Sequence, residues 1–490
     1  MKKENPIQII WEPDKSQNIP VYQQIINFMC GCISDGKWPV GTRLPSRREL
    51  AEKFQVNRST ISYALDELTA WGVLEGHHGA GTYVISNTWS LLLQESPVWN
   101  QYVNSGFFRK NSEMIQEINN LEADPEMVRL GTGEPDPRLF PTEAWREAVM
   151  NSSSRLSSLG YLEPLGLPEL RKALSLHMKT LGIEAPPETI LITSGSLQGL
   201  QLISACLLKK GSLVYTEAPT YLKSLQVFQS AGLKLTGIPM DKEGIQFWKM
   251  GTLLKKEPSD YSSVLYTIPT NHNPTGRNMT PERRRDLLEY CIRNRLPIIE
   301  DGAYQELCFS GENRTPLKAS DPSGMVIYLG SASKSFAPGL RIGWIIAPEP
   351  IVQRLGDAKM QMDYGASSVS QWVFTELLES GRYREYGIEL RKELKLRRDK
   401  ALRVLDQYFM SLADWEVPEG GFYIWLRLKR NTPMEVLFQE AVRSHILLNP
   451  GDLYDFAHNH SLRLSYAYTS SDEFERAAQE LSVLIRKMEV

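Results

Sequence analysis

The segment 331-SASKSFAPGLRIGW-344 places a lysine among serines and follows it with Gly-Leu-Arg. It comes directly after 325-MVIYLG-330, a short apolar run with the length and composition of a buried strand. Lys334 could be an ordinary surface lysine. However, sheets of parallel strands bind their ligands at the carboxyl ends of the strands, which is where this lysine falls. The residues that follow other strands of the same kind decide between the two interpretations.

Four further apolar runs have the same form and alternate with helical patterns from about residue 126 onward. Each run ends in Gly, Pro, Ser or an acid, as buried parallel strands do before their loops. The pattern predicts an α/β domain in which the five carboxyl ends meet at one edge of a sheet. The runs are 189-TILITSG-195, 212-SLVYTEAP-219, 263-SVLYTIP-269 and 296-LPIIEDGAY-304.

Polar residues follow each of the five runs, and we expect them to lie close together. The Gly turn after the first run opens a helix and offers free backbone amides to a phosphate. Taken singly, each residue has a plain explanation, such as a helix start, a tight turn or core packing. The set comprises Ser194, Gly195 and Ser196, then Tyr221, then Asn273 in 271-NHNPTG-276, then Asp301 and Tyr304, and finally Ser331, Ser333, Lys334 and Arg341.

Taken together, these residues supply every contact that pyridoxal phosphate needs. This cofactor requires an amine for a Schiff base, a phosphate cup, and an acid opposite the ring nitrogen. It also requires a hydrogen bond to its phenolic oxygen and an aromatic ring stacked on its own. Lys334 is the candidate amine, and Asp301 is the acid that would keep the ring nitrogen protonated.

Residues 128–485 resemble the fold type I aminotransferases, and the motifs that carry this resemblance are highly specific. The resemblance implies that Lys334 forms an internal aldimine with pyridoxal phosphate and that Tyr221 stacks on the ring. It also implies that Asp301 pairs with the ring nitrogen. The remaining implied contacts are Ser196, Ser331 and Arg341 to the phosphate, and Asn273 and Tyr304 to the phenolic oxygen.

Two further residues match positions of the same family. Tyr161, in 161-YLEPLG-166, matches the tyrosine that reaches the phosphate from the partner subunit. Arg463, in 462-LRLSYAY-468, matches the arginine that binds the carboxylate of an amino acid. A planar guanidinium can donate two parallel hydrogen bonds to a carboxylate, which suits it to this role.

The first 85 residues have a different organisation, with three helical patterns and a hairpin. Ser46 and Glu49 form a capping box at the start of the second helix, and Asn57 is placed to cap the third. Two helices joined by a tight turn and followed by a hairpin predict an α+β winged helix-turn-helix. The four patterns are 20-PVYQQIINFMCGCISDG-36, 44-LPSRRELAEKF-54, 58-RSTISYALDELTAWG-72 and 73-VLEGHHGAGTYVI-85.

Basic residues gather on this part of the chain, where Arg43, Arg47, Arg48, Lys53 and Arg58 fall within sixteen residues. Near the start of the third helix, Arg58, Ser59, Ser62 and Tyr63 lie off the apolar stripe, where groove-facing residues belong. Residues 19–85 resemble the DNA-binding domain of the GntR family of bacterial transcription regulators. The resemblance implies that Arg47, Arg58 and the wing glycines Gly79 and Gly81 contact double-stranded DNA.

The composition limits the other possibilities. The chain has 490 residues, 42% of them hydrophobic, and a net charge of -3, so any affinity for nucleic acid must come from a local patch. The amino terminus has no apolar core of a signal peptide, and no apolar run is long enough to span a membrane. Five cysteines, with no second Cys or His pair beside Cys30 and Cys32, predict neither a disulfide framework nor a metal site. We expect a cytoplasmic protein.

The sequence therefore predicts a multidomain chain. A winged helix-turn-helix occupies residues 1–85, a linker residues 86–125, and an aminotransferase-like domain residues 126–490. This layout resembles the MocR subfamily of GntR-type regulators, and the resemblance implies a homodimer that senses rather than metabolises. An amine or amino-acid effector, its carboxylate on Arg463, would displace Lys334 from the cofactor and change operator binding.

Two other functions remain open at the level of the sequence. The chemical site looks complete, so the protein could be a working aminotransferase whose DNA-binding module localises or autoregulates it. Alternatively, pyridoxal phosphate itself could be the signal, with no amine required. Turnover with a panel of amino donors would favour the first, and operator binding that responds to the cofactor alone would favour the second.

Overall fold

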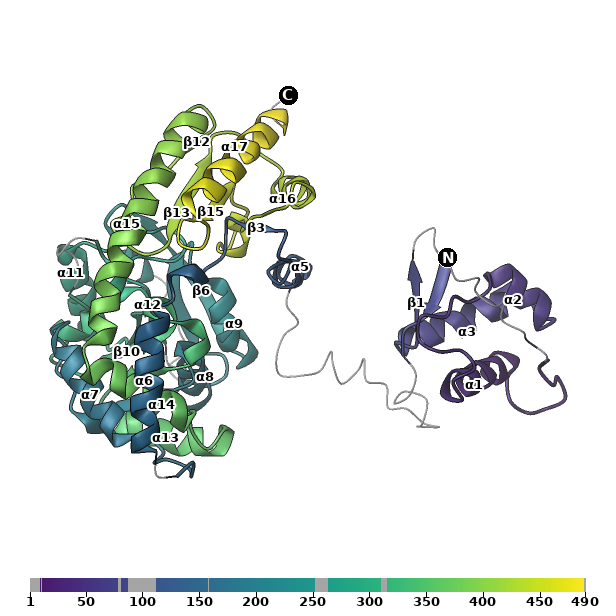
Figure 1. Cartoon of the computed structure of the whole chain (residues 1–490), viewed down its shortest axis with the longest axis horizontal. Helices are drawn as coiled ribbons and strands as arrows, with labels where there is room; N and C mark the ends of the chain where they lie inside the picture. The colour runs from purple at the N-terminus through teal and green to yellow at the C-terminus, as the bar shows by residue number, and fades with distance from the viewer. Residues whose placement is uncertain are drawn as a thin grey trace. The chain divides into compact units, whose positions relative to one another are not determined.

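The computed structural model describes residues 9, 11–77, 81–86, 112–156, 158–251, 263–309 and 315–488. The chain divides into two compact units, Met1–Gly106 and Phe107–Val490 (Figure 1). The division falls inside the segment expected to be a linker.

The first unit is the expected winged helix-turn-helix. Its core contains the apolar stripe of the third helix, including Ile61, Leu65 and Leu68. Ser46 and Glu49 form the predicted capping box, and Asn57 occupies the expected N-cap position of the third helix, although its side chain makes no capping hydrogen bond. The described elements are α1 (Val21–Ser34), α2 (Arg47–Lys53), α3 (Arg58–Ala70), and the antiparallel strands β1 (Leu74–His77) and β2 (Gly81–Val84).

The second unit is built on a sheet whose described strands lie in the order β4-β11-β10-β9-β8-β5-β6-β7. The five predicted strands run in one direction, but the unforeseen strand β11 is antiparallel to both β10 and β4 and separates them. The bounds are β4 (Ile190–Thr193), β5 (Leu213–Ala218), β6 (Lys234–Asp241), β7 (Gly244–Ile245), β8 (Val264–Thr267), β9 (Ile298–Asp301), β10 (Val326–Ser331) and β11 (Gly343–Ile346).

Both faces of this sheet are buried. Along β4, Ile190 and Ile192 belong to one apolar cluster and Leu191 to another, because successive side chains point to opposite faces. The helices described around the sheet are α6 (Thr142–Arg155), α7 (Pro168–Lys179), α8 (Ser196–Cys206), α9 (Leu222–Ser230), α11 (Pro281–Arg293), α12 (Ala332–Ser335), α13 (Glu349–Met362) and α14 (Ser368–Glu379).

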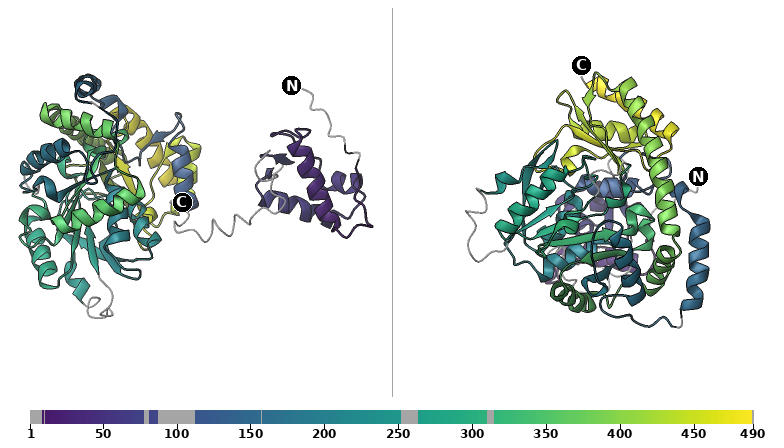
Figure 2. Two further views of the ribbon diagram at one scale, coloured as in Figure 1. Left: turned by 90° about the horizontal axis from the view of Figure 1, so that it is seen from below. Right: turned by 90° about the vertical axis from the view of Figure 1, so that its left-hand side faces the viewer.

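A smaller lobe lies at one end of the second unit (Figures 1 and 2). Its three-stranded sheet has the order β12-β13-β15, and a separate pair joins β3 to β14. The elements are β3 (Val128–Arg129), α15 (Arg382–Tyr408), β12 (Ala413–Asp414), β13 (Tyr423–Leu428), α16 (Met434–Arg443), β14 (Ile446–Leu447), β15 (Ser461–Ser465) and α17 (Ser471–Met488).

Part of the expected linker belongs to this second unit. Residues 113–121 form helix α5 (Glu113–Leu121), whose start is capped by the Ser112 hydroxyl. Ile118 is 3% exposed and packs in the apolar core of the smaller lobe. The segment from Ser112 onward is therefore a packed part of the aminotransferase-like unit.

The segment 331–344 reverses the chain direction between β10 and β11. It contains the single turn α12, which carries Lys334, and a short 3-10 turn at Pro338–Leu340. Strands β10 and β11 pack closely after this reversal. Gly330 pairs with Trp344, and a Cβ atom at Gly330 would overlap the buried indole ring. Only glycine leaves room for the Trp344 ring at this point of the strand that leads to Lys334.

Gly330→Ala is therefore expected to lower the free energy of unfolding of the second unit by about 1–3 kcal/mol, because the indole must move within a packed core. Gly339→Ala is the matched control, since nothing lies within 4 Å of a Cβ at that position. Urea denaturation followed by tryptophan fluorescence measures both variants. Equal losses in the two would contradict the proposed role of Gly330.

Candidate functional site

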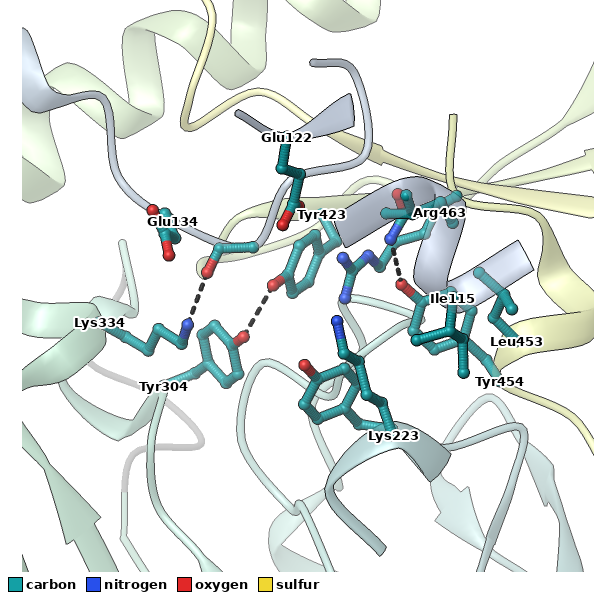
Figure 3. Close-up of a pocket in the computed structure, with 14 residues that line it drawn as sticks. Ile115, Glu122, Glu134, Lys223, Tyr304, Lys334, Tyr423, Leu453, Tyr454 and Arg463 are labelled. Carbon is teal, nitrogen blue, oxygen red and sulfur yellow. Dashed lines mark hydrogen bonds between the residues drawn. The ribbon is translucent and has the colours of Figure 1, made fainter. Parts of the chain in front are cut away.

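The carboxyl ends of the strands deliver the predicted polar residues to one region. Asp301 is the last residue of β9, and Ser331 ends β10 and caps α12 by accepting a hydrogen bond from the Ser333 amide at 3.1 Å. Lys334 follows one turn later and lines a cavity of about 160 Å³ (Figure 3). The same cavity is lined by Tyr221 and Tyr304.

The Lys334 amine faces the cavity and donates a hydrogen bond to the Gly133 carbonyl oxygen at 2.7 Å. Loss of hydration lowers the pKa of Lys334 from its ordinary value to about 8. Arg463 acts in the same direction, whereas Glu134 and Asp301 oppose the shift. An amine with this pKa is partly neutral, and therefore nucleophilic, near physiological pH.

Asp301 is a buried acid with two hydrogen bonds. Its carboxylate accepts one from the Tyr266 hydroxyl at 2.7 Å and one from the Ala303 amide at 3.0 Å. Burial raises the pKa of Asp301 above its ordinary value, and the bond from Tyr266 opposes the change. Tyr266, on β8, is a supporting residue that the sequence did not reveal.

A network of neutral polar groups joins the predicted residues to one another. The Asn273 amide nitrogen donates to the Tyr304 hydroxyl at 3.3 Å, while its carbonyl oxygen accepts from Arg463 at 2.9 Å. The Tyr304 hydroxyl also lies 2.7 Å from the hydroxyl of Tyr423, a residue that the sequence did not reveal. Asn273 thus holds the tyrosine and the arginine in fixed positions.

Arg463 is 3% exposed, yet no ion pair with a carboxylate is found for it among the residues described. Its guanidinium donates to the Gly131 carbonyl oxygen at 2.6 Å and to Asn273, and its Nε has no hydrogen-bond partner within the described chain. The faces of Tyr423 and Tyr454 lie 4.2 and 4.7 Å from it. Neutral acceptors and aromatic faces hold this cation, which leaves its charge to be matched by an anion.

A group of residues suited to a phosphate lies where β4, α8 and β11 meet. Gly195 has φ +89° and precedes α8, and a Cβ there would lie 2.8 Å from the Arg341 guanidinium. Gly343, on β11, leaves room for the backbone at Gly195 and Ser196. The Arg341 guanidinium donates to the Ser194 carbonyl oxygen at 2.6 Å. A helix start, an arginine and two glycines without side chains fit a phosphate group.

Two tyrosines predicted to contact the cofactor, Tyr221 and Tyr161, lie in different places. Tyr221 lines the cavity, and its ring is stacked 6.3 Å from that of Tyr454. Tyr161 is 83% exposed, is not among the residues that line the cavity, and has its ring 5.2 Å from that of Tyr364. Within one chain, therefore, the structure brings Tyr161 to the surface and not to the cavity.

Several lining residues carried no usable signal in the sequence. Glu122, Glu134, Lys223, Asn449 and Tyr454 stand in unremarkable surroundings, and only the fold brings them to the cavity. Ile115 and Ile118 had a detectable signal, since Ser112 caps a short amphipathic helix, but they fell within the expected linker.

The expected DNA-contacting residues lie mainly on the exposed surface of the first unit. Arg58, Ser59 and Tyr63 are exposed on α3, and Ser62 is half-buried. Arg47 pairs with Asp66 at 2.6 Å and Arg48 with Glu52 at 3.3 Å, but exposed pairs of this kind contribute little and can be exchanged for phosphate. The Arg43 guanidinium lies beside Gly81, and Gly79 falls outside the described residues.

Comparison with known proteins assigns both units. Residues 21–84 match the gntR family of bacterial regulatory proteins, and residues 125–481 match the class I and II aminotransferases. The HTH-type transcriptional regulator YisV of Bacillus subtilis is 45% identical over 479 residues, covering 98% of each chain. The chain belongs to this family of regulators. NorG, an HTH-type transcriptional regulator of Staphylococcus aureus, is 33% identical over 459 residues, covering 91% of this chain and 100% of NorG.

Solved structures resemble the aminotransferase unit of this regulator. A multiple substrate aminotransferase from Thermococcus profundus has a TM-score of 0.73 and 29% identity, covering 78% of this chain and 96% of that one. The Pyrococcus horikoshii kynurenine aminotransferase, solved with PMP, has a TM-score of 0.73 and 32% identity, covering 77% and 95%. The expected fold, a GntR-type reader joined to a fold type I aminotransferase domain, is confirmed, and the family implies pyridoxal phosphate as its cofactor.

No helix in the described part of this regulator is both long and apolar enough to cross a membrane.

The lowered pKa of Lys334 predicts an unusual pH dependence for its reactivity. Because its pKa is about 8, the neutral amine should form as the pH rises through 8, well below the ordinary value of 10.5. Labelling with an acylating reagent across pH 6–11, followed by peptide mass spectrometry, should show a half-maximal rate for Lys334 near pH 8. The exposed Lys172 is the internal reference, and a midpoint for Lys334 near pH 10 would refute the shift.

Proposed function

We propose that this regulator is of the MocR type and binds pyridoxal phosphate, acting in the cytoplasm on double-stranded operator DNA. An amine or amino-acid effector binds at the cofactor and changes the affinity for DNA. One observation carries the proposal: the Lys334 amine and the buried guanidinium of Arg463, which forms no ion pair within the described chain, line the same cavity. A molecule that carries both an amino group and a carboxylate matches these two residues.

The residues of the chain divide the work of holding the two ligands. When bound, pyridoxal phosphate supplies an aldehyde that condenses reversibly with amines and a ring that accepts electrons. Lys334 provides the amine that the effector replaces, and Asp301 holds a proton on the ring nitrogen. Tyr221 stacks against the ring. The phosphate group is assigned to Ser194, Gly195, Ser196, Ser331, Ser333 and Arg341, and the phenolic oxygen to Asn273 and Tyr304.

Arg463 selects the effector by its charge. A carboxylate that enters the cavity replaces no ion pair between described residues, because neutral acceptors hold this guanidinium. The attraction is strengthened by the aromatic faces that keep water from Arg463. Once a carboxylate is bound, Lys334 and the effector amine compete for the same position.

The change at the cavity must reach the DNA-binding unit. We assign this role to the chain between the two units and to a homodimer. In the homodimer, the spacing of the two DNA-binding units decides whether both half-sites of the operator are occupied. Tyr161, exposed in the single chain, is assigned to the partner's phosphate. The effector shifts the equilibrium only by its preference for one arrangement.

A second candidate function is transamination. The buried acid Asp301 lies close enough to Lys334 to influence its pKa, which is about 8, and a working aminotransferase needs both an acid and an amine of this kind. Turnover of a broad panel of amino donors and keto acids separates the two, because a sensor needs only binding, whereas an enzyme must release a new amino acid at every cycle.

The coupling is tested with DNA selected by the full-length protein from a random pool. With pyridoxal phosphate present, some members of an amino-acid panel should change the affinity for this DNA by at least about fivefold. Lys334→Ala should retain DNA binding and lose the response. A response of equal size in Lys334→Ala, or none in the wild-type protein with any amine, would overturn the proposal.

Arg58→Ala is expected to weaken binding to the selected DNA by roughly 1–3 kcal/mol, because Arg58 is exposed at the start of α3. Arg293→Ala, which removes an exposed arginine from the second unit, is the control. A loss confined to one base position indicates a base contact, and a uniform loss with a smaller salt dependence indicates a phosphate contact. Unchanged affinity would remove Arg58 from the DNA-binding surface.

A further inference from the structure

Helix α5 forms one wall of the cavity that contains Lys334. Two of its residues, Ile115 and Ile118, line the cavity and are 9% and 3% exposed. Ile118 also belongs to the apolar core of the smaller lobe, whereas Ile115 belongs to none of the core clusters among the described residues. Ile115 is therefore a buried lining residue that belongs to no core cluster among the described residues.

Polar contacts attach the same helix to the rest of the site. The Lys223 amine, on α9, donates to the Asn119 side-chain oxygen at 2.6 Å. The Thr132 hydroxyl donates to the carboxylate of Glu122, at the end of the helix, at 3.1 Å. Lys223 and Glu122 both line the cavity (Figure 3), so α5 is attached at points where a bound molecule would lie.

The part of the cavity lined by α5 can bind one further part of an amino-acid effector. If the effector's amino group and carboxylate are bound at Lys334 and Arg463, the aliphatic part of the lining comes from α5 and from Leu453, beside four tyrosine rings. Figure 3 shows Ile115 beside Leu453 and Tyr454, with Lys334 on the other side of the pocket. The side chain of an amino acid is the remaining group that such a wall can bury.

The same helix is the first described element that follows the DNA-binding unit. The last strand of that unit, β2, ends at Val84, and α5 begins at Glu113. Helix α5, which forms a wall of the cavity, is therefore covalently continuous with the chain that leads to the DNA-binding unit. A molecule that packs on Ile115 acts directly on the element from which this chain starts.

We propose that helix α5 recognises the effector of this protein and selects an amino acid with an aliphatic side chain through contact with Ile115. When that side chain binds, it holds α5 in place, and this change in α5 is passed towards the DNA-binding unit. The proposal rests on the proposed function, since it requires an amino-acid effector at the cofactor. It adds the class of side chain and the element that recognises it.

The test uses two stable ligands that need no reaction, N-(5′-phosphopyridoxyl)-L-leucine and N-(5′-phosphopyridoxyl)-L-alanine, with the full-length protein. Burial of the larger side chain should make the leucine compound bind about tenfold more tightly. In Ile115→Ala the ratio of the two dissociation constants should fall to about two- to threefold. Asn120→Ala, at an exposed position of the same helix, should leave it unchanged.

Hydrogen exchange provides the second readout. The leucine compound should slow amide exchange in residues 113–121 more than the alanine compound does, and this difference should shrink in Asn119→Ala, which removes the acceptor of Lys223. Asn120→Ala is again the control. An equal effect of the two compounds on α5 would overturn its role as the element that passes on occupancy.

The outcomes distinguish a failure of the inference about α5 from a failure of the proposed cofactor site. If both compounds bind but the ratio is the same in wild-type protein and Ile115→Ala, the inference about α5 is wrong and the cofactor site stands. If neither compound binds the wild-type protein, the cofactor site itself is wrong. If Ile115→Ala fails to bind the alanine compound because it does not fold, Ile115→Val decides, and an unchanged ratio there contradicts the inference.

Discussion

The close approach of β11 to β4 and to the start of α8 positions the charged groups of this site. Gly343 faces the backbone at Gly195, so a side chain on Gly343 would push the two apart, whereas a side chain on Gly195 would meet the Arg341 guanidinium. Because β11 continues directly from the segment that carries Lys334 and Arg341, this contact brings the amine, the guanidinium and the start of α8 to one edge of the sheet. The geometry of the site thus follows from the requirement that two strands and a helix meet without side chains between them.

The second constraint is the burial of two positive side chains, neither of which forms an ion pair with a carboxylate among the described residues. Arg463 is surrounded by tyrosine faces and neutral oxygens, and Lys334 has lost part of its hydration, which lowers its pKa to about 8. Both groups are costly to maintain in this state, and both are stabilised by a ligand that brings an aldehyde or a carboxylate. Binding of such ligands does not require turnover, so the proposed sensing role is compatible with an aminotransferase-like pocket.

Much of this arrangement was predictable because strands leave local signals. Runs such as 325-MVIYLG-330, followed by Gly, Ser or an acid, located the strand ends, and the residues after them were the predicted cofactor set. The antiparallel strand β11 was missed because its few residues follow directly on the Lys334 segment. Tyr423 and Tyr454 reach the cavity from the smaller lobe through contacts distant in sequence, which no local period records. Helix α5 was assigned to the linker because nine residues between weakly patterned segments gave too short a period to place it in the larger unit.

The most direct test of the account is the chemical identity of the group attached at position 334. The full-length protein, incubated with pyridoxal phosphate and reduced with borohydride, is digested and its peptides are mapped by mass spectrometry. The account predicts a phosphopyridoxyl group on the peptide that contains Lys334, and its loss from that peptide when an amino-acid effector is added before reduction. A label found only on other lysines, or on none, would contradict it.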